Sequence, residues 1–87
     1  MFRAARHGDC DQITRLYRQL HPHDPVLDNG SDVAVFQQIL DSLALHLFVL
    51  LDGAVVVTAY LNVIPNLTRA AAPYAVIENV VVDQARH

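Results

Sequence analysis

Two segments in the second half of the chain are apolar on both of their faces. Ala54 to Ile64 and Tyr74 to Val82 read as strands, and alternate residues along each are largely apolar whichever face is taken. An antiparallel sheet with one solvated face alternates apolar with polar residues more cleanly. A sheet built from these strands therefore needs a covering layer on each side.

Helical patterns supply one such layer. Apolar residues recur at helical spacing in two segments: Ile13, Leu16, Tyr17 and Leu20, then Phe36, Ile39, Leu40 and Leu43. Asp9 is expected to accept hydrogen bonds from first-turn amides of the first helix, which ends at Pro22. The second helix is expected from about residue 32 to 43. Two short helices cover one face only, so missing chain, a second copy or a partner must cover the other.

The remaining segments complete an α+β fold. We expect strands at Phe2 to Ala5 and at His46 to Leu51, with the second joined to the next strand by an Asp52-Gly53 turn. Residues 21–31 and 65–73 are rich in turn-forming types and read as loops. The order β-α-α-β-β-β predicts a mainly antiparallel sheet with two helices on one face, in a single, incomplete domain over residues 1–87.

The composition excludes several classes of protein. The chain has 87 residues, 53% of them hydrophobic and 17% charged, which fits one globular domain. A net charge of −3 with six Lys and Arg argues against nucleic-acid binding. No apolar run is long enough for a membrane span or a signal sequence, so we expect a cytoplasmic protein without membrane contact. Cys10 is the only cysteine. It stands either as a small buried residue or with its thiol pKa lowered by the first turn of a helix.

The element order and three stretches of sequence resemble the GNAT superfamily of acetyl-CoA-dependent N-acetyltransferases. The stretches are FRAARHGDCDQITRLYRQL, HLFVLLDGAVVVTAYL and IPNLTRAAAPYAVIENVVVD. In that family the fourth strand leads into a loop of pattern R/Q-x-x-G-x-G/A that opens a helix, and IENVVVDQARH looks like that strand and the start of that loop. The resemblance covers essentially the whole chain but about the first half of the family's three-layer domain.

The resemblance implies acetyl-CoA as the cofactor. Backbone N–H groups of the loop hold its pyrophosphate, and the fourth strand pairs with its pantetheine arm. The predicted cofactor-binding residues are therefore Val80, Val81 and Val82 through their backbone, with Arg86 and His87 at the start of the loop. An ordinary paired strand is the alternative for the three valines. Since all three glycines precede Val82, the 87 residues are expected to be an inactive fragment.

Glu78 is the predicted catalytic residue. It stands in the middle of an apolar strand, where an unpaired charge is costly, so its pKa is expected to be raised. The reaction that the resemblance implies is direct attack of a primary amine on the thioester, with a carboxylate near the fourth strand accepting the amine's proton. The alternatives are a structural acid paired with an arginine or one that faces a solvent-filled groove.

Two loops are expected to flank the pocket for the acceptor, a small-molecule or peptide amine. The predicted acceptor-binding residues are His21, Asp24, Tyr60, Asn66, Arg69 and Asn79. Arg69 is expected to pair with a carboxylate of the acceptor or with Glu78, or else to be a surface arginine. Core packing is the alternative for Tyr60, and a sheet-edge position is the alternative for Asn79. The two histidines of His21-Pro22-His23 lack a third ligand at a suitable spacing, so no metal site is expected.

Two classes of function remain open at this point. One is the N-acetyltransferase, and the other is a non-catalytic half-GNAT module that self-associates and binds a ligand or partner. The strand from Tyr74 to Val82 is expected to lie at the edge of the sheet, where pairing with another copy favours a homodimer or larger assembly.

Overall fold

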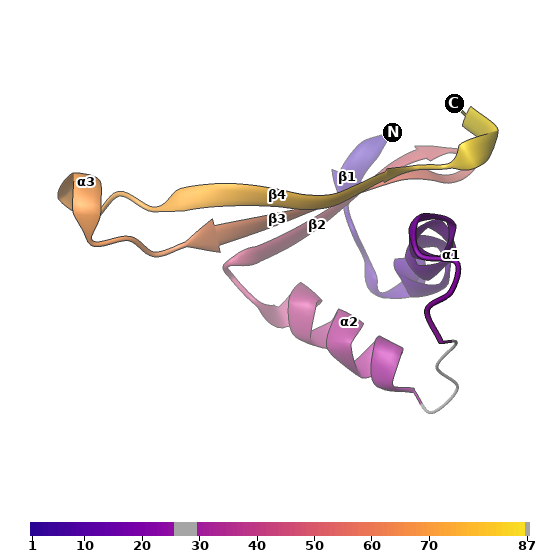
Figure 1. Cartoon of the computed structure of the whole chain (residues 1–87), viewed down its shortest axis with the longest axis horizontal. Helices are drawn as coiled ribbons and strands as arrows, with labels where there is room; N and C mark the ends of the chain where they lie inside the picture. The colour runs from indigo at the N-terminus through magenta and orange to yellow at the C-terminus, as the bar shows by residue number, and fades with distance from the viewer. Residues whose placement is uncertain (26–29, 87) are drawn as a thin grey trace.

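A computed structural model describes residues 1–25 and 30–86, and in it a layer of helices lies against one face of a sheet (Figure 1). The main elements are β1 (Phe2–Ala4), α1 (Cys10–Leu20), α2 (Ser31–Asp41), β2 (Leu45–Asp52), β3 (Ala54–Ile64) and β4 (Tyr74–Val82). Three short turns of helix join them: η1 (His7–Asp9), α3 (Thr68–Ala71) and η2 (Gln84–Arg86). The predicted order of strands and long helices is confirmed, and the three short turns were not predicted.

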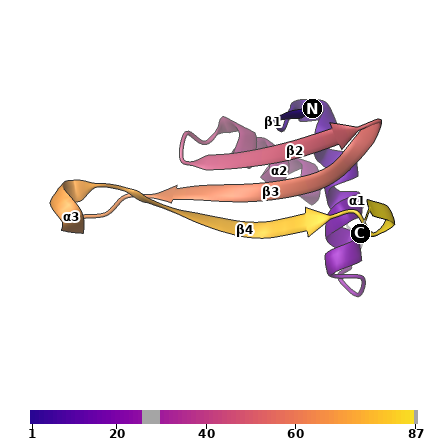
Figure 2. The same cartoon turned by 90° about the horizontal axis from the view of Figure 1, so that it is seen from above.

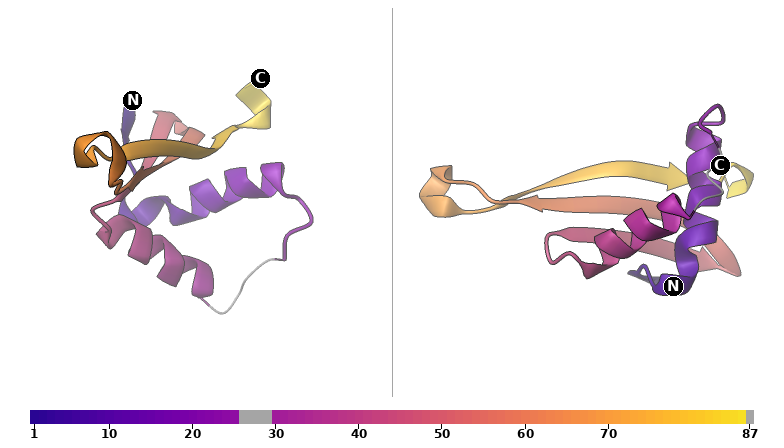
Figure 3. Two further views of the ribbon diagram at one scale, coloured as in Figure 1. Left: turned by 60° about the vertical axis from the view of Figure 1, so that its left-hand side comes forward. Right: turned by 90° about the horizontal axis from the view of Figure 1, so that it is seen from below.

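The sheet is antiparallel throughout, in the order β1-β2-β3-β4 (Figure 2). Gly53 has φ +78° between β2 and β3, so the predicted turn is confirmed. The β3–β4 hairpin is long, and its tip extends beyond both helices (Figure 3). At that tip Arg69, Ala70 and Ala71 have left-handed φ values of 54°, 59° and 62°. Arginine and alanine have no preference for that region, which is why residue type did not predict this turn.

The core lies between α1 and the sheet. Ile13 and Leu16 of α1 are 1% and 0% exposed, and they pack with the buried Val49, Val55 and Val81. This confirms the helical stripe predicted for α1. In α2 the stripe ends early, because Ser42 is extended (φ −84°, ψ 133°) and Leu43 is 96% exposed. The second helix was therefore predicted about two residues too long.

The opposite side of the sheet has no helix over it in the described part of the chain (Figures 1 and 2). Alternation from the buried strand residues assigns twelve residues to this surface, called here the bare face: Phe2, Ala4, His46, Phe48, Leu50, Val57, Ala59, Leu61, Val63, Ala75, Ile77 and Val82. None of the twelve is an Asp, Glu, Lys or Arg, and the rings of Phe2 and Phe48 stack with centroids 5.3 Å apart. Two helices thus cover one face only, as the sequence predicted.

Asp9 does not cap α1 as predicted. Its carboxylate accepts hydrogen bonds from the two terminal guanidinium nitrogens of Arg3, at 2.6 and 3.1 Å, and from the backbone N–H of Arg6 at 2.7 Å. The hydrogen bond from Arg3 is the main reason that the pKa of Asp9 is lowered. A charged guanidinium from β1 outcompetes the helix amides for this buried carboxylate, so Asp9 joins β1 to η1.

Cys10 is a small buried residue, 8% exposed, and not an activated thiol. Burial raises the pKa of its thiol, and the nearby carboxylates of Asp32 and Asp11 raise it further. Desolvation and the nearby negative charges thus raise the pKa of this thiol, and they outweigh the lowering expected from the first turn of the helix.

Candidate functional site

A bulge interrupts β4 at its centre. Thr58 pairs with Val81 and Tyr60 pairs with Glu78, so Asn79 and Val80 together oppose the single residue Ala59. Asn79 has φ 51°, a left-handed conformation that asparagine tolerates better than most residues. Simple alternation predicted Val81 on the face opposite Glu78. That prediction is wrong, because the extra residue turns the buried Val81 to the helix-facing side, where Glu78 also lies.

The end of β4 forms one wall of a recess on the free edge of the sheet. The recess has a volume of about 290 Å³ and lies between the last turn of α1 and β4, lined by Gln19, Leu20, Val80, Val81, Val82 and Gln84. Among the described residues no strand pairs with the outer edge of β4. The structure therefore brings the three valines predicted to bind cofactor to an apolar, accessible strand edge.

Glu78 lies on the helix-facing side of the sheet, opposite Tyr60. It is exposed, so the buried environment expected for it is not found. The pKa of Tyr60 is raised by burial and then by the charge of Glu78, and the pKa of Tyr17 is raised by burial and then by Tyr60. Tyr60 pairs with Glu78 across β3 and β4, and Tyr60 and Tyr17 both pack against the core, so the three residues form a row on the helix-facing side of the sheet. Tyr17 was not predicted, because its helical spacing matched a core residue equally well.

Asn62 is a second residue that the sequence did not single out. It follows Tyr60 on the same face of β3, and its side-chain Oδ1 is buried without a hydrogen-bond partner among the described residues. A buried carbonyl oxygen without a donor is costly, so this atom is a polar feature of the row that a neighbouring molecule can satisfy.

The two loops predicted to flank one pocket lie at opposite ends of the molecule (Figure 1). His21 and Asp24 line the same recess of about 240 Å³ beside α1. Asn66 lies at the hairpin tip, where its side chain bonds Thr68 at 2.9 Å. Arg69 is exposed at the same tip, and no ion pair between it and Glu78 occurs in residues 1–25 and 30–86.

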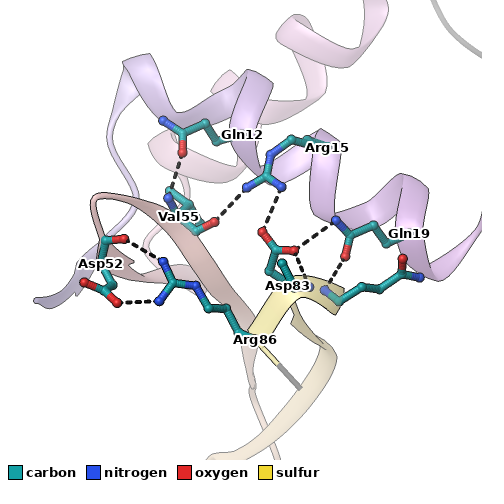
Figure 4. Close-up of polar contacts among 9 residues, drawn as sticks. Gln12, Arg15, Gln19, Asp52, Val55, Asp83 and Arg86 are labelled. Carbon is teal, nitrogen blue, oxygen red and sulfur yellow. Dashed lines mark hydrogen bonds and ion pairs between the residues drawn. The ribbon is translucent and has the colours of Figure 1, made fainter.

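The segment after β4 is held by a polar cluster (Figure 4). Asp83 accepts from Arg15 at 2.9 Å, from Gln19 at 3.3 Å and from the N–H of Ala85 at 3.0 Å. The other nitrogen of Arg15 donates to the carbonyl of Val55 at 2.9 Å. The start of β3 and the end of β4 are thereby fixed to one face of α1.

Arg86, predicted to bind cofactor, is engaged elsewhere in this structure. Its guanidinium bonds the carboxylate of Asp52 at 2.6 Å and the carbonyl of the same residue at 3.2 Å (Figure 4). Both side chains are exposed, so this ion pair is weak and exchangeable. The other residue predicted for the loop, His87, lies outside the described residues.

Comparison of the sequence with protein-family models and with curated proteins finds no match. Comparison with solved structures finds a putative acetyltransferase from Agrobacterium tumefaciens, 46% identical and with a TM-score of 0.93. That match covers 100% of this chain and 61% of the other. The chain is a partial GNAT domain.

Two more solved structures share the GNAT fold at low identity. One is a transcriptional regulator from Bacillus halodurans (22% identity, TM-score 0.89, 100% of this chain and 62% of that chain). The other is a predicted acetyltransferase from Clostridium acetobutylicum solved with acetyl-CoA (19%, 0.72, 98% and 60%). The GNAT segment described here thus spans about three-fifths of the length of each relative.

Two other kinds of feature do not occur in the described residues of this GNAT segment. No three His, Cys, Asp or Glu side chains in residues 1–25 and 30–86 gather closely enough to hold a metal ion. Within the same residues, no helix has the length and apolar character needed to cross a membrane.

The Asp83 cluster predicts an acid-sensitive attachment of η2 to the GNAT sheet. Hydrogen bonds from Arg15, Ala85 and Gln19 lower the pKa of Asp83 to about 2, against roughly 3.9 in an unfolded chain. A lowered folded-state pKa stabilises the fold above about pH 4, and the effect is lost as pH falls towards 2. We expect Asp83→Asn to flatten the dependence of Tm on pH in that window. Asp41→Asn, on an exposed carboxylate of α2, is the matched control; equal flattening by both variants would contradict the assignment.

Proposed function

We propose that this chain is part of an enzyme that transfers the acetyl group of acetyl-CoA to a primary amine. The observation that supports the proposal is 46% identity, along the whole chain, to a putative acetyltransferase with nearly the same structure. We propose a small-molecule or peptide amine as the acceptor and a cytoplasmic location. We propose neither a nucleic-acid partner, which the net charge of −3 disfavours, nor a membrane partner.

The edge of β4 is the proposed site for the pantetheine arm. An extended arm with amide groups binds the outer edge of a sheet as an additional strand does, through backbone N–H and C=O groups. The recess beside Val80, Val81 and Val82 offers such an edge with apolar walls. Acetyl-CoA bound there supplies the thioester. Arg86 is paired with Asp52 in this structure, so its contact with a phosphate is proposed for the whole enzyme and not for the 87 residues alone.

Glu78 is the proposed general base. An amine is largely protonated at neutral pH and must lose a proton before its nitrogen forms a bond to the acetyl carbon while the carbon–sulfur bond breaks. Glu78 is exposed, faces Tyr60, and lies next to the bulge that precedes the cofactor edge. Its carboxylate, directly or through a water, receives that proton, and the sulfur leaves as a thiolate.

The 87 residues alone are proposed to bind the arm without turning over. All three glycines of the chain, Gly8, Gly30 and Gly53, precede β4, so no glycine supports a close backbone approach to the pyrophosphate. The contacts that remain are those with the pantetheine arm.

This predicts that acetyl-pantetheine and acetyl-CoA bind about equally well. In a ¹⁵N NMR titration of the 87-residue chain, both are expected to shift the amides of residues 80–82, with dissociation constants within about threefold, because both offer the same arm. Asn79→Gly keeps the positive φ and should bind as before, whereas Asn79→Val opposes it and should weaken binding at least about fivefold. Shifts confined to other elements would overturn the proposed edge.

A second prediction concerns Glu78. In an active enzyme that contains this segment, Glu78→Gln is expected to lower kcat/KM for a primary amine by about 100-fold or more, because the proton acceptor is lost. The loss should shrink at high pH, where more of the amine is already unprotonated. Asp41→Asn serves as the control. A change within about threefold for Glu78→Gln would remove this residue from the base role.

Self-association is a second candidate function, favoured by the surface of the chain. The accessible surface is 6140 Å², about 1,000 Å² more than size scaling gives for a compact monomer of 9.7 kDa. A stable interface buries roughly 800 Å² per partner. The bare face carries no Asp, Glu, Lys or Arg, so a second copy is the proposed occupant for a non-catalytic module.

Sedimentation of the 87-residue chain at micromolar concentration tests this candidate. We expect a dimer or larger, and we expect Ile77→Lys to give a monomer by placing a charge on the bare face. Leu67→Lys makes the same change at a residue that is 96% exposed and off that face, and it should leave the dimer intact. A monomeric parent chain would contradict self-association.

A further inference from the structure

One face of α1 carries a stripe of polar side chains that bond to the sheet. Gln12, Arg15 and Gln19 are spaced by three and four residues, so they follow one another along the same side of the helix (Figure 4). The first accepts the N–H of Val55 in β3, and the second donates to the carbonyl of Val55 and to the carboxylate of Asp83. Gln19 is the last of the three, and its partners are the two residues that follow β4.

Gln19 uses both ends of its side-chain amide. Its Oε1 accepts the backbone N–H of Gln84 at 2.8 Å, and its Nε2 donates to Oδ1 of Asp83 at 3.3 Å. A backbone N–H only donates and an ionised carboxylate only accepts, so these two partners fix which way round the amide lies. Neither a carboxylate nor an ammonium group can make both bonds, because the first lacks a donor and the second lacks an acceptor.

The same glutamine borders the recess at the outer edge of β4. That recess is lined by the three valines of β4, by the last two residues of α1 and by Gln84. Gln19 is therefore one wall of the recess and also holds another wall in place. Arg15 separately anchors Asp83 to α1 through a charge-assisted bond at 2.9 Å. Loss of the bonds from Gln19 should therefore alter the recess while β4 stays attached to the helix.

We propose that Gln19 is a positioning residue for the pantetheine arm and acts through Gln84. By holding the N–H of Gln84 it fixes the turn that follows β4, and with it the wall beside the edge of residues 80–82. An arm that enters a preformed recess binds more tightly than one that must first order the turn, because no ordering cost remains at binding. This role rests on the proposed binding of the arm at that edge, and it adds a contribution from α1.

Acetyl-pantetheine is the probe, titrated into the 87-residue chain and followed by ¹⁵N NMR at about pH 7 and about pH 4. The probe carries no charge, so the parent chain should bind it within about twofold at the two pH values. Gln19→Glu removes the donor to Asp83 and brings two carboxylates together, which should weaken binding at least about fivefold at pH 7. The charged groups already in this cluster, Arg15 and Asp83, are unchanged.

Acid should reverse the effect of this substitution. The new carboxyl group becomes protonated towards about pH 4, and it can then donate to Asp83 while its carbonyl accepts the N–H of Gln84. Asp83 remains ionised there, because its pKa is about 2. The affinity of Gln19→Glu should therefore return to within about twofold of the parent chain. Gln19→Ala has no group that acid restores, and it should bind weakly at both pH values.

Gln37→Glu is the matched control. Gln37 of α2 donates to Asp41 at 2.9 Å, so the substitution makes the same change in a glutamine–aspartate pair that does not line the recess. The two glutamate substitutions should change Tm similarly, and Gln37→Glu should leave binding unchanged at both pH values.

Three results would overturn the role of Gln19. They are equal binding by the parent and Gln19→Glu chains, weakening that acid does not reverse, and equal weakening by Gln37→Glu. A different failure is possible for the edge itself: if the folded parent chain shows no shifts at residues 80–82, the arm does not bind there, and the role of Gln19 falls with that site.

Discussion

The packing of α1 against the sheet is the interaction on which the rest of the structure depends. Ile13 and Leu16 are almost fully buried under Val49 and Val55, and the polar side of the same helix holds the backbone of β3. Gln12 accepts the N–H of Val55, the second residue of β3, at 2.7 Å. A single helix thereby fixes both where the central strand starts and where the edge strand ends.

Local pattern predicted the elements well, because each is encoded within about a dozen residues. Helical spacing located α1 and α2, and Asp52-Gly53 located the hairpin turn. What failed depends on contacts between different elements. Arg3 takes the carboxylate of Asp9 from the helix, and the pairing of β4 with β3 shifts at Asn79. No period within a single segment carries that information.

The candidate site was predicted unevenly for the same reason. The three valines of β4 were named from a resemblance to a family, and they do line one recess. Glu78 was named from the cost of burying a charge, yet it is exposed, since the reach of two helices over a sheet is a tertiary property. Tyr17 and Asn62 carry no distinctive motif, and only their neighbours in space make them notable.

The bulge in β4 decides which residues of that strand face the helices and which face the other side of the sheet. On the hairpin side of Asn79, side chains alternate in one phase, and beyond it they alternate in the other, so the acid and the buried valine share a face although three positions separate them. Losing or gaining one residue there would restore plain alternation and move either Glu78 or Val81 to the wrong side. Substitution at position 79 by a residue that accepts a left-handed backbone keeps the bulge, and with it the orientation of the side chains on either side. During evolution this strand can therefore tolerate substitutions at the bulge, but an insertion or deletion there would change which residues face the helices.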